Sequence, residues 1–251
     1  MRFKRLCTLL ATAPLLAFAE SHQYCPADAS PGAWNPARDG ASLVPYHGTG
    51  HGWTSAVVKV SGNVISFDST ANPATSPLAF TGEASTNRIS TVFAIVRMAS
   101  PDGGSLPTLI DAPGHDIRLR RAPLSNPAQW SFETDGATHV SVNGTDSADF
   151  TPSQGFQLVE IDFASPVALN DLRIGGAAPR PQWDRNWSGI AELILLANAP
   201  APEQRDALRL YAHRKWRVNV PSTPDGMDAQ TLLLGLGLRT GNPFSSSLFI
   251  R

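Results

Sequence analysis

The chain has 251 residues, enough for one large domain or two small ones and for a substantial hydrophobic core. Its 20 basic and 21 acidic residues leave a formal net charge of −1, which argues against the broad basic field of a nucleic-acid-binding protein. With 20 Gly and 21 Pro we expect many turns rather than a helical bundle, and 42% hydrophobic residues argue against disorder.

Residues 1–19 have the form of a secretory signal peptide. Basic residues near the start precede an apolar run over 6–16, and Ala17-Phe18-Ala19 provides the small-residue pattern that signal peptidase recognises. The run is too short for a comfortable membrane span, and Glu20 follows it directly. We therefore expect a secreted, periplasmic or cell-surface protein with a cleaved signal peptide and no membrane span, rather than a buried N-terminal helix.

Residues 20–43, which follow the signal peptide, are rich in Ala, Pro, Asp and Gly, and this composition predicts an irregular N-terminal arm. Cys7 leaves with the signal peptide, so Cys25 is alone in the mature chain and cannot form an internal disulfide. A disulfide scaffold is therefore excluded.

Between residues 44 and 194, short apolar runs alternate with turn clusters, the pattern of an all-β sandwich. The run 89–98 is apolar on both faces and suits a central strand covered on both sides. Ser61-Gly62-Asn63 and the pair Asn143-Gly144 predict hairpin turns. The expected strands are 57–60, 64–67, 89–98, 108–110, 117–121, 130–132, 139–142, 157–163, 172–174 and 190–196.

One helix is expected near the C-terminus. Pro202 suits a first helical position, and an apolar stripe for docking on a sheet follows at helical spacing. The stripe consists of Leu208, Tyr211, Ala212 and Trp216. We expect Pro221 to end this helix and residues 221–251 to form a linker and a tail, which could add a strand or hairpin to the sandwich.

The run Trp187-Ser-Gly-Ile-Ala-Glu-Leu-Ile-Leu-Leu196, then Ala-Pro-Glu-Gln-Arg at 201–205 and Leu-Tyr-Ala-His-Arg-Lys-Trp at 210–216, resembles the end of bacterial LamG-like domains of the concanavalin A-like lectin/glucanase group. In that family a G-x-I-A-E strand leads into a short helix with a Y-L-x-x-K-W motif. The resemblance implies a jelly-roll β-sandwich over 44–220 with one short C-terminal helix. It leaves the activity open, because this fold hosts lectins, hydrolases, lyases and adhesion modules.

Glu160 and Asp162 are the candidate catalytic residues, at spacing two on one expected strand face. Laminarinase-like hydrolases of this fold carry E-x-D-x-x-E or E-x-D-x-E on such a strand. The third carboxylate is missing, because Ala164 and Ser165 stand where it would fall. A hydrolase or lyase is therefore the alternative function, and the two carboxylates could instead simply line a solvent-facing side.

Residues 182–188 concentrate the chemistry of sugar recognition. Trp183 can stack on a sugar ring, while Asp184, Arg185 and Asn186 can hydrogen-bond to its hydroxyls. Trp187 is expected to pack beneath the helix. We therefore predict a non-catalytic, lectin-like carbohydrate-binding or adhesion module whose partner is a glycan or cell-surface polysaccharide, or else another surface protein.

No cofactor is expected, although Ca²⁺ is the cation that the sequence could accommodate. Asp111 and Asp116 flank a Pro-Gly turn and offer carboxylate oxygens, but no dense acidic loop accompanies them. His47 and His51 lie in a glycine-rich loop without an evident third zinc ligand.

Overall fold

The structure is a computed structural model, and a large part of the chain is described in it. The described residues are 21–25, 28–30, 33–37, 41–46, 58–61, 64–67, 79–82, 87–98, 108–111, 117–121, 130–134, 137–174, 189–221 and 227–239. The expected signal peptide, the His47–His51 loop and the segment with Trp183, Asp184, Arg185 and Asn186 lie outside these residues.

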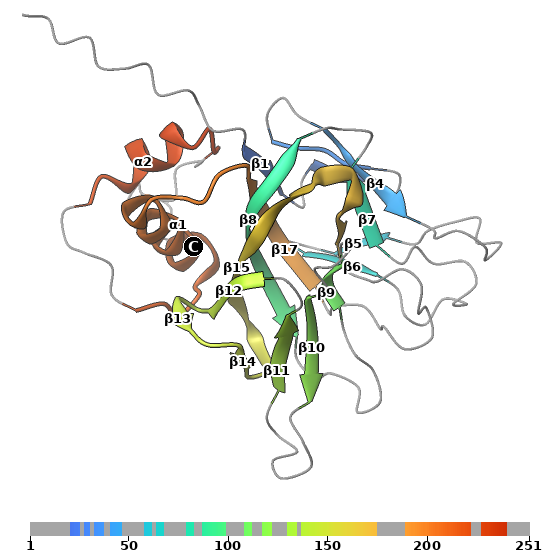
Figure 1. The fold of residues 1–251 in the computed structure, drawn as a ribbon, viewed down its shortest axis with the longest axis horizontal. Coiled ribbons are helices and arrows are strands. Elements are labelled where there is room, and N and C mark those ends of the chain that lie inside the picture. Colours follow the sequence, from blue (N-terminus) through green and yellow to red (C-terminus); the bar gives the residue numbers. More distant parts are fainter. Residues whose placement is uncertain are drawn as a thin grey trace, which may run out of the picture.

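Most of the described chain forms β-strands in antiparallel sheets, accompanied by two short helices (Figure 1). The first sheet has its long strands at the centre and short strands at its edges. Its order is β13 (Thr145–Asp146), β12 (Ala137–Val142), β15 (Ser153–Ala168), β8 (Arg88–Met98), β17 (Gly189–Leu196), β6 (Val64–Phe67) and β5 (Val58–Ser61), and β1 (Ser21–Tyr24) pairs with β17 off this path.

The second sheet consists of shorter strands. Its order is β14 (Asp149–Phe150), β11 (Trp130–Thr134), β10 (Ile117–Arg121), β9 (Thr108–Asp111), β16 (Arg173–Ile174), β7 (Ala79–Gly82), β4 (Leu43–Tyr46), β3 (Ala33–Trp34) and β2 (Ala29–Ser30). A short 3-10 helix, Leu169–Asp171, lies between β15 and β16.

The ten strands expected from the sequence all form, with ends that differ by a few residues. Both predicted hairpins are confirmed, because Ser61 pairs with Val64 and Val142 pairs with Thr145. In the second hairpin Asn143 and Gly144 have φ of 54° and 76°, the left-handed conformation that a two-residue turn requires.

Strand β8 is buried on both faces, as its sequence predicts. Val92, Ala94 and Val96 join a cluster that also contains side chains of the second sheet, such as Leu109 and Ile110. Phe93 and Ile95 point to the opposite side and pack with residues of the two helices. The first sheet therefore has one apolar face toward the second sheet and one toward the helices.

The N-terminal arm expected to be irregular instead contributes strands. Residues 21–24 form β1, in register with Leu193–Leu196 of β17, and β2 and β3 extend the second sheet. Tyr24 and Trp34 are fully buried, with their ring centroids 5.8 Å apart and their planes at 62°, an edge-on contact. The segment has no alternation of apolar and polar residues that would predict a strand. It is ordered instead by these two aromatic side chains and by pairing with a strand some 170 residues away.

Helix α1 (Pro202–Trp216) forms where the sequence predicts it, and its apolar stripe is buried against the first sheet. Ala201 cannot cap the helix, but Gln204 accepts a hydrogen bond from the Ala201 N–H at 2.9 Å. The helix ends at Trp216 rather than at Pro221, because Arg217 adopts a left-handed conformation with φ of 59°.

The tail forms a second helix in place of the strand or hairpin that its sequence suggested. Helix α2 (Ala229–Gly235) begins at Asp228, whose side chain accepts a hydrogen bond from the Thr231 N–H. Its buried residues, with Leu236 and Leu238, pack in the same cluster as α1, and both helices lie on one side of the strands (Figure 1). No helix in the described part of the chain is long and apolar enough to span a membrane.

Candidate functional site

The carboxylates of Glu160 and Asp162 share one face of β15, as expected, but this face lies beneath helix α1. Glu160 is fully buried, and the Asp162 side chain is 18% exposed. The view that the pair could line a solvent-facing side is therefore wrong, because α1 docks on that side through its apolar stripe.

Two arginines of α1 bind these carboxylates. Arg205 donates to Glu160 Oε2 at 3.0 Å and to both oxygens of Asp162 at 2.9 and 3.0 Å. Arg209 donates to Glu160 through Nε at 2.8 Å and Nη2 at 3.1 Å. Thr91 of β8 adds a hydrogen bond to Asp162 Oδ1 at 2.7 Å. Arg205, Arg209 and Thr91 thus hold the two acids in fixed positions.

The electrostatics of this cluster suit a structural role. Burial alone would lower the pKa of Arg205, but its hydrogen bonds to Asp162 and Glu160 raise that pKa above its ordinary value. A glycoside hydrolase needs one carboxyl group that exchanges a proton and one that reaches a sugar or a water. Here both groups are hydrogen-bonded to permanent cations, so the cluster fastens α1 to the sheet.

A second buried acid, Glu192 of β17, was not among the residues that the sequence singled out as a site. It is fully buried. Its Oε1 accepts from Tyr211 at 2.7 Å and from Gln23 of β1 at 2.6 Å. Its Oε2 accepts from Lys215 at 2.9 Å and from the Trp216 indole at 2.5 Å.

The Glu192 cluster explains why the Gly-Ile-Ala-Glu strand and the Tyr, Lys and Trp of α1 occur together in the sequence. The acid of Gly-Ile-Ala-Glu on the strand and the Tyr, Lys and Trp of the helix are mutual hydrogen-bonding partners. Burial and the Glu192 charge raise the pKa of Tyr211 well above its ordinary value, so its hydroxyl stays a donor. One signal could have revealed this acid: it is the single charged residue in an eight-residue apolar strand.

Cys25 lies beside the same cluster, with its Sγ 3.7 Å from Glu192 Oε1. Burial and the Glu192 carboxylate raise the pKa of its thiol to about 12. A nucleophilic or metal-binding cysteine needs a stabilised thiolate. Cys25 is therefore a neutral thiol at physiological pH.

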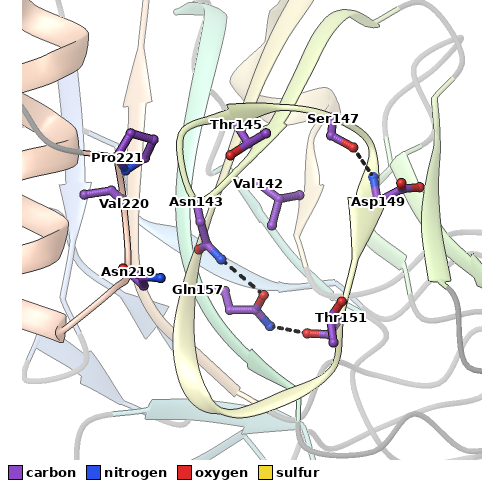
Figure 2. A pocket seen from close by; sticks show the side chains of 10 residues that line it. All are labelled: Val142, Asn143, Thr145, Ser147, Asp149, Thr151, Gln157, Asn219, Val220 and Pro221. Atoms are coloured by element: carbon purple, nitrogen blue, oxygen red, sulfur yellow. Dashed lines mark hydrogen bonds between the residues drawn. The ribbon is translucent and has the colours of Figure 1, made fainter.

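A pocket of about 510 Å³ lies between the β12–β13 hairpin and the chain that follows α1 (Figure 2). We call it the hairpin pocket. Its volume falls in the range of small-molecule sites, about 300–1,000 Å³. The hairpin pocket is lined by Val142, Asn143, Thr145, Ser147, Asp149, Thr151, Gln157, Asn219, Val220 and Pro221.

The amides of the hairpin pocket are held by their neighbours. Asn143 Oδ1 accepts from the Leu158 N–H at 2.9 Å, and Asn143 Nδ2 donates to Gln157 Oε1 at 3.4 Å. Gln157 is buried and donates through Nε2 to the Thr151 carbonyl at 2.9 Å. Ser147 Oγ accepts from the Asp149 N–H at 3.0 Å. Figure 2 shows these groups on the strand side of the pocket, across from Asn219.

The two walls of the pocket meet at Gly144. A Cβ added there would lie 3.0 Å from Pro221 Cδ and 3.3 Å from Arg209 Nε. Only glycine allows both this close approach and the positive φ of the turn. The Asn-Gly signal in the sequence predicts the hairpin, but the approach of residues 219–221 depends on where α1 docks.

Only one of the two candidate metal ligands lies within the described residues. Asp111 lies in β9, where its backbone is in register with Arg173 of β16, and Asp116 lies outside the described residues. Among the described residues there is no group of three or more His, Cys, Asp or Glu that could hold a metal ion.

Comparison of the chain with protein-family models, with curated proteins and with solved structures finds no match.

Proposed function

We propose that the mature chain is a non-catalytic, lectin-like module that binds a glycan or a cell-surface polysaccharide. One observation supports this proposal most strongly: the hairpin pocket is lined mainly by hydroxyl and amide side chains. Each of these groups can donate and accept hydrogen bonds, as sugar hydroxyls do. Among the described lining residues there is one carboxylate, Asp149, whereas glycoside hydrolysis requires a pair of acids.

The proposed fold is a concanavalin A-like jelly-roll β-sandwich of the LamG-like kind. Two antiparallel sheets with a common buried cluster support it, together with a closing strand and helix that meet through Glu192. An experimental structure of the mature chain tests this assignment. Two facing sheets with jelly-roll connections are expected, and sheets that do not face each other would contradict it.

The segment with Trp183, Asp184, Arg185 and Asn186 is the second proposed contact with the glycan, and it lies outside the described residues. Trp183 supplies a flat apolar face for a sugar ring, which none of the described lining residues of the hairpin pocket provides. We expect Trp183→Ala to weaken glycan retention without a change in melting temperature. Trp187→Ala is the matched control, and we expect it to destabilise the fold by about 3–5 kcal/mol.

The alternative function is a polysaccharide hydrolase or lyase that uses Glu160 and Asp162. The hydrogen bonds from Arg205 and Arg209 argue against this function, because they occupy the carboxylate oxygens that would have to reach a sugar or a water. The test is a glycan panel offered to the mature chain, with both binding and product formation measured. Binding without products is expected. Products that disappear in Glu160→Gln would overturn the non-catalytic assignment, and capture of a surface protein without any bound glycan would favour the adhesion alternative.

The proposed route to this function is secretion through a cleaved signal peptide. The test is N-terminal sequencing of the exported protein. A first residue of Glu20 is expected, and an exported chain that still begins at Met1 would contradict the cleavage.

A further inference from the structure

We propose that strand β1 and residues 236–239 form a clasp that opens and closes as one unit and controls the access of disulfides to Cys25. We call these two segments the terminal clasp. They lie at opposite ends of the described chain, and Ser21 and Leu236, which are in contact, are separated by 215 positions in the sequence. Three features support a single unit: the hydrogen bonds between the segments, the turn at Gly237 and the position of Cys25.

The side chain of Gln23 in β1 pairs with the backbone of Arg239 as a neighbouring strand would. Its Oε1 accepts from the Arg239 N–H at 2.7 Å, and its Nε2 donates to the Arg239 carbonyl at 3.2 Å. Ser21 Oγ donates to the Leu236 carbonyl, and the Arg239 guanidinium donates to the Ala37 carbonyl. Each segment satisfies polar groups of the other, so the position of one depends on the position of the other.

The same Gln23 amide also reaches the buried Glu192 cluster. Gln23 is buried, and its Nε2 donates to Glu192 Oε1 at 2.6 Å and to the Tyr211 hydroxyl at 3.0 Å. A buried amide that loses its hydrogen-bond partners is costly. The closed position of Gln23 is therefore stable only while β1, residues 236–239 and the buried acid are together.

Gly237 makes the turn that brings the tail to β1. Its φ of 74° is left-handed, and the Leu238 N–H donates to the Leu233 carbonyl at 3.1 Å, as in a glycine cap at the end of a helix. A Cβ at Gly237 would lie 3.2 Å from Ser21 Oγ. Both the turn and the contact with β1 therefore favour glycine at this position.

Cys25 directly follows β1, and its Sγ lies 3.7 Å from Glu192 Oε1. A strand of four residues and a helix of seven are too short to be stable alone, so the terminal clasp belongs among the segments that open locally. Tyr24 is fully buried beside Trp34 and keeps β1 closed most of the time. Disulfides reach Cys25 through rare openings of the clasp, without unfolding of the sheets.

The test is the reaction of DTNB with the folded mature chain, in which Cys25 is the one cysteine. The thiolate attacks one sulfur of DTNB, a mixed disulfide forms, and one thionitrobenzoate leaves, whose absorbance gives the rate. We expect Gly237→Ala to raise this rate about tenfold, because a side chain at this φ strains the closed clasp.

Gly144→Ala is the matched control, the same substitution at a φ of 76° in the β12–β13 hairpin. Its strain persists when the clasp opens, so the Cys25 rate should stay within about twofold of the unchanged chain. Two results would overturn the inference. One is a rate in Gly237→Ala equal to that of the unchanged chain. The other is an equal increase in both variants, which would mean that Cys25 reacts through unfolding of the whole chain.

Amide hydrogen exchange tests whether the two segments move together. Gly237→Ala should speed exchange of the β1 amides, and Gln23→Ala should speed exchange of the Gly237 and Leu238 N–H groups, which donate to carbonyls of α2 rather than to Gln23. Gly144→Ala should change neither. Exchange that speeds only in the substituted segment would show that β1 and residues 236–239 open separately.

Discussion

At the scale of single residues, the buried acid Glu192 is the shared hydrogen-bond acceptor of several side chains. Tyr211, Lys215, Trp216 and Gln23 all donate to its two oxygens. Removal of one partner from a buried charged cluster leaves the remaining polar groups without hydrogen-bond or charge partners. The resulting loss in free energy of unfolding exceeds the net stability that the intact cluster contributes.

We expect Glu192→Gln to lower the free energy of unfolding by roughly 2–4 kcal/mol, because the buried Tyr211 hydroxyl and Trp216 indole lose a charged acceptor and the partly exposed Lys215 ammonium loses its counter-charge. Urea denaturation measures this change. Asp171→Asn is the matched control, an exposed acid in the 3-10 helix, and should change stability by less than about 0.5 kcal/mol. Equal stabilities of the two variants would show that Glu192 is not the centre of a buried cluster.

Cys25 provides a second test at this scale. Its thiol pKa of about 12 means that very little thiolate is present in the folded chain at pH 8. We expect reaction with a disulfide reagent such as DTNB to be at least ~100-fold slower in the native protein than in urea, where the pKa returns to about 8.5. The native rate should rise with pH up to the folded pKa. Equal rates in the folded and unfolded chains would contradict a partly buried thiol beside Glu192.

At the scale of elements, helix α1 is fastened to the first sheet by ion pairs as well as by its apolar stripe. A double-mutant cycle of Glu160→Gln and Arg209→Met in urea denaturation measures one of these pairs, and we expect a coupling of about 1–3 kcal/mol. The control cycle uses Arg209 and Asp206, a longer contact of 3.4 Å within the helix, where the coupling should stay below about 0.5 kcal/mol. Equal couplings would mean that Glu160 is solvated and free for other roles.

The β12–β13 hairpin gives the second prediction at this scale. Gly144→Ala should lower the free energy of unfolding by about 1–2 kcal/mol, because a side chain is strained at a φ of 76° and would press on Pro221. Gly155→Ala in β15 is the matched control, since its Cβ would meet only Ser153 Oγ at an ordinary 3.5 Å. The Gly144 variant should also lose glycan affinity. If the two variants behaved alike, the two walls would not meet at this turn.

The elements also show what the sequence can and cannot predict. The two-sided burial of β8, the stripe of α1 and the Asn-Gly hairpin all follow from local patterns, and the structure confirms them. The strand β1 and the helix α2 do not, because each is ordered by a partner outside its own segment: β1 by β17, some 170 residues away, and α2 by the preceding helix α1.

The same limit applies to the candidate site. Spacing two places Glu160 and Asp162 on one strand face, but only the docking of α1 decides whether that face meets solvent or arginines. The hairpin pocket is equally non-local, since its second wall comes from residues 219–221. Two features of the sequence could have indicated the buried acid clusters. Glu192 is the one charged residue in an apolar strand, and Arg205 and Arg209 lie four residues apart beside the apolar stripe of α1.

At the scale of the whole molecule, the first sheet separates two environments. One face packs toward the second sheet, and the other carries the helices and the two buried acid clusters. The hairpin pocket lies at the border of the helix side, where β12, β13 and β15 meet the chain that leaves α1. The buried acids therefore serve the architecture, and the neutral polar groups at the border remain available to a ligand.

The most direct test of this division is NMR of the mature chain during titration with the neutral oligosaccharides cellohexaose, mannohexaose and xylohexaose. We expect saturable shifts of the side-chain amide signals of Asn143, Gln157 and Asn219, unchanged signals from the Arg205 and Arg209 guanidinium groups, and no cleavage products in the sample. Shifts concentrated at Arg205 and Arg209 together with released sugars would contradict the account, as would the absence of any shift with every oligosaccharide.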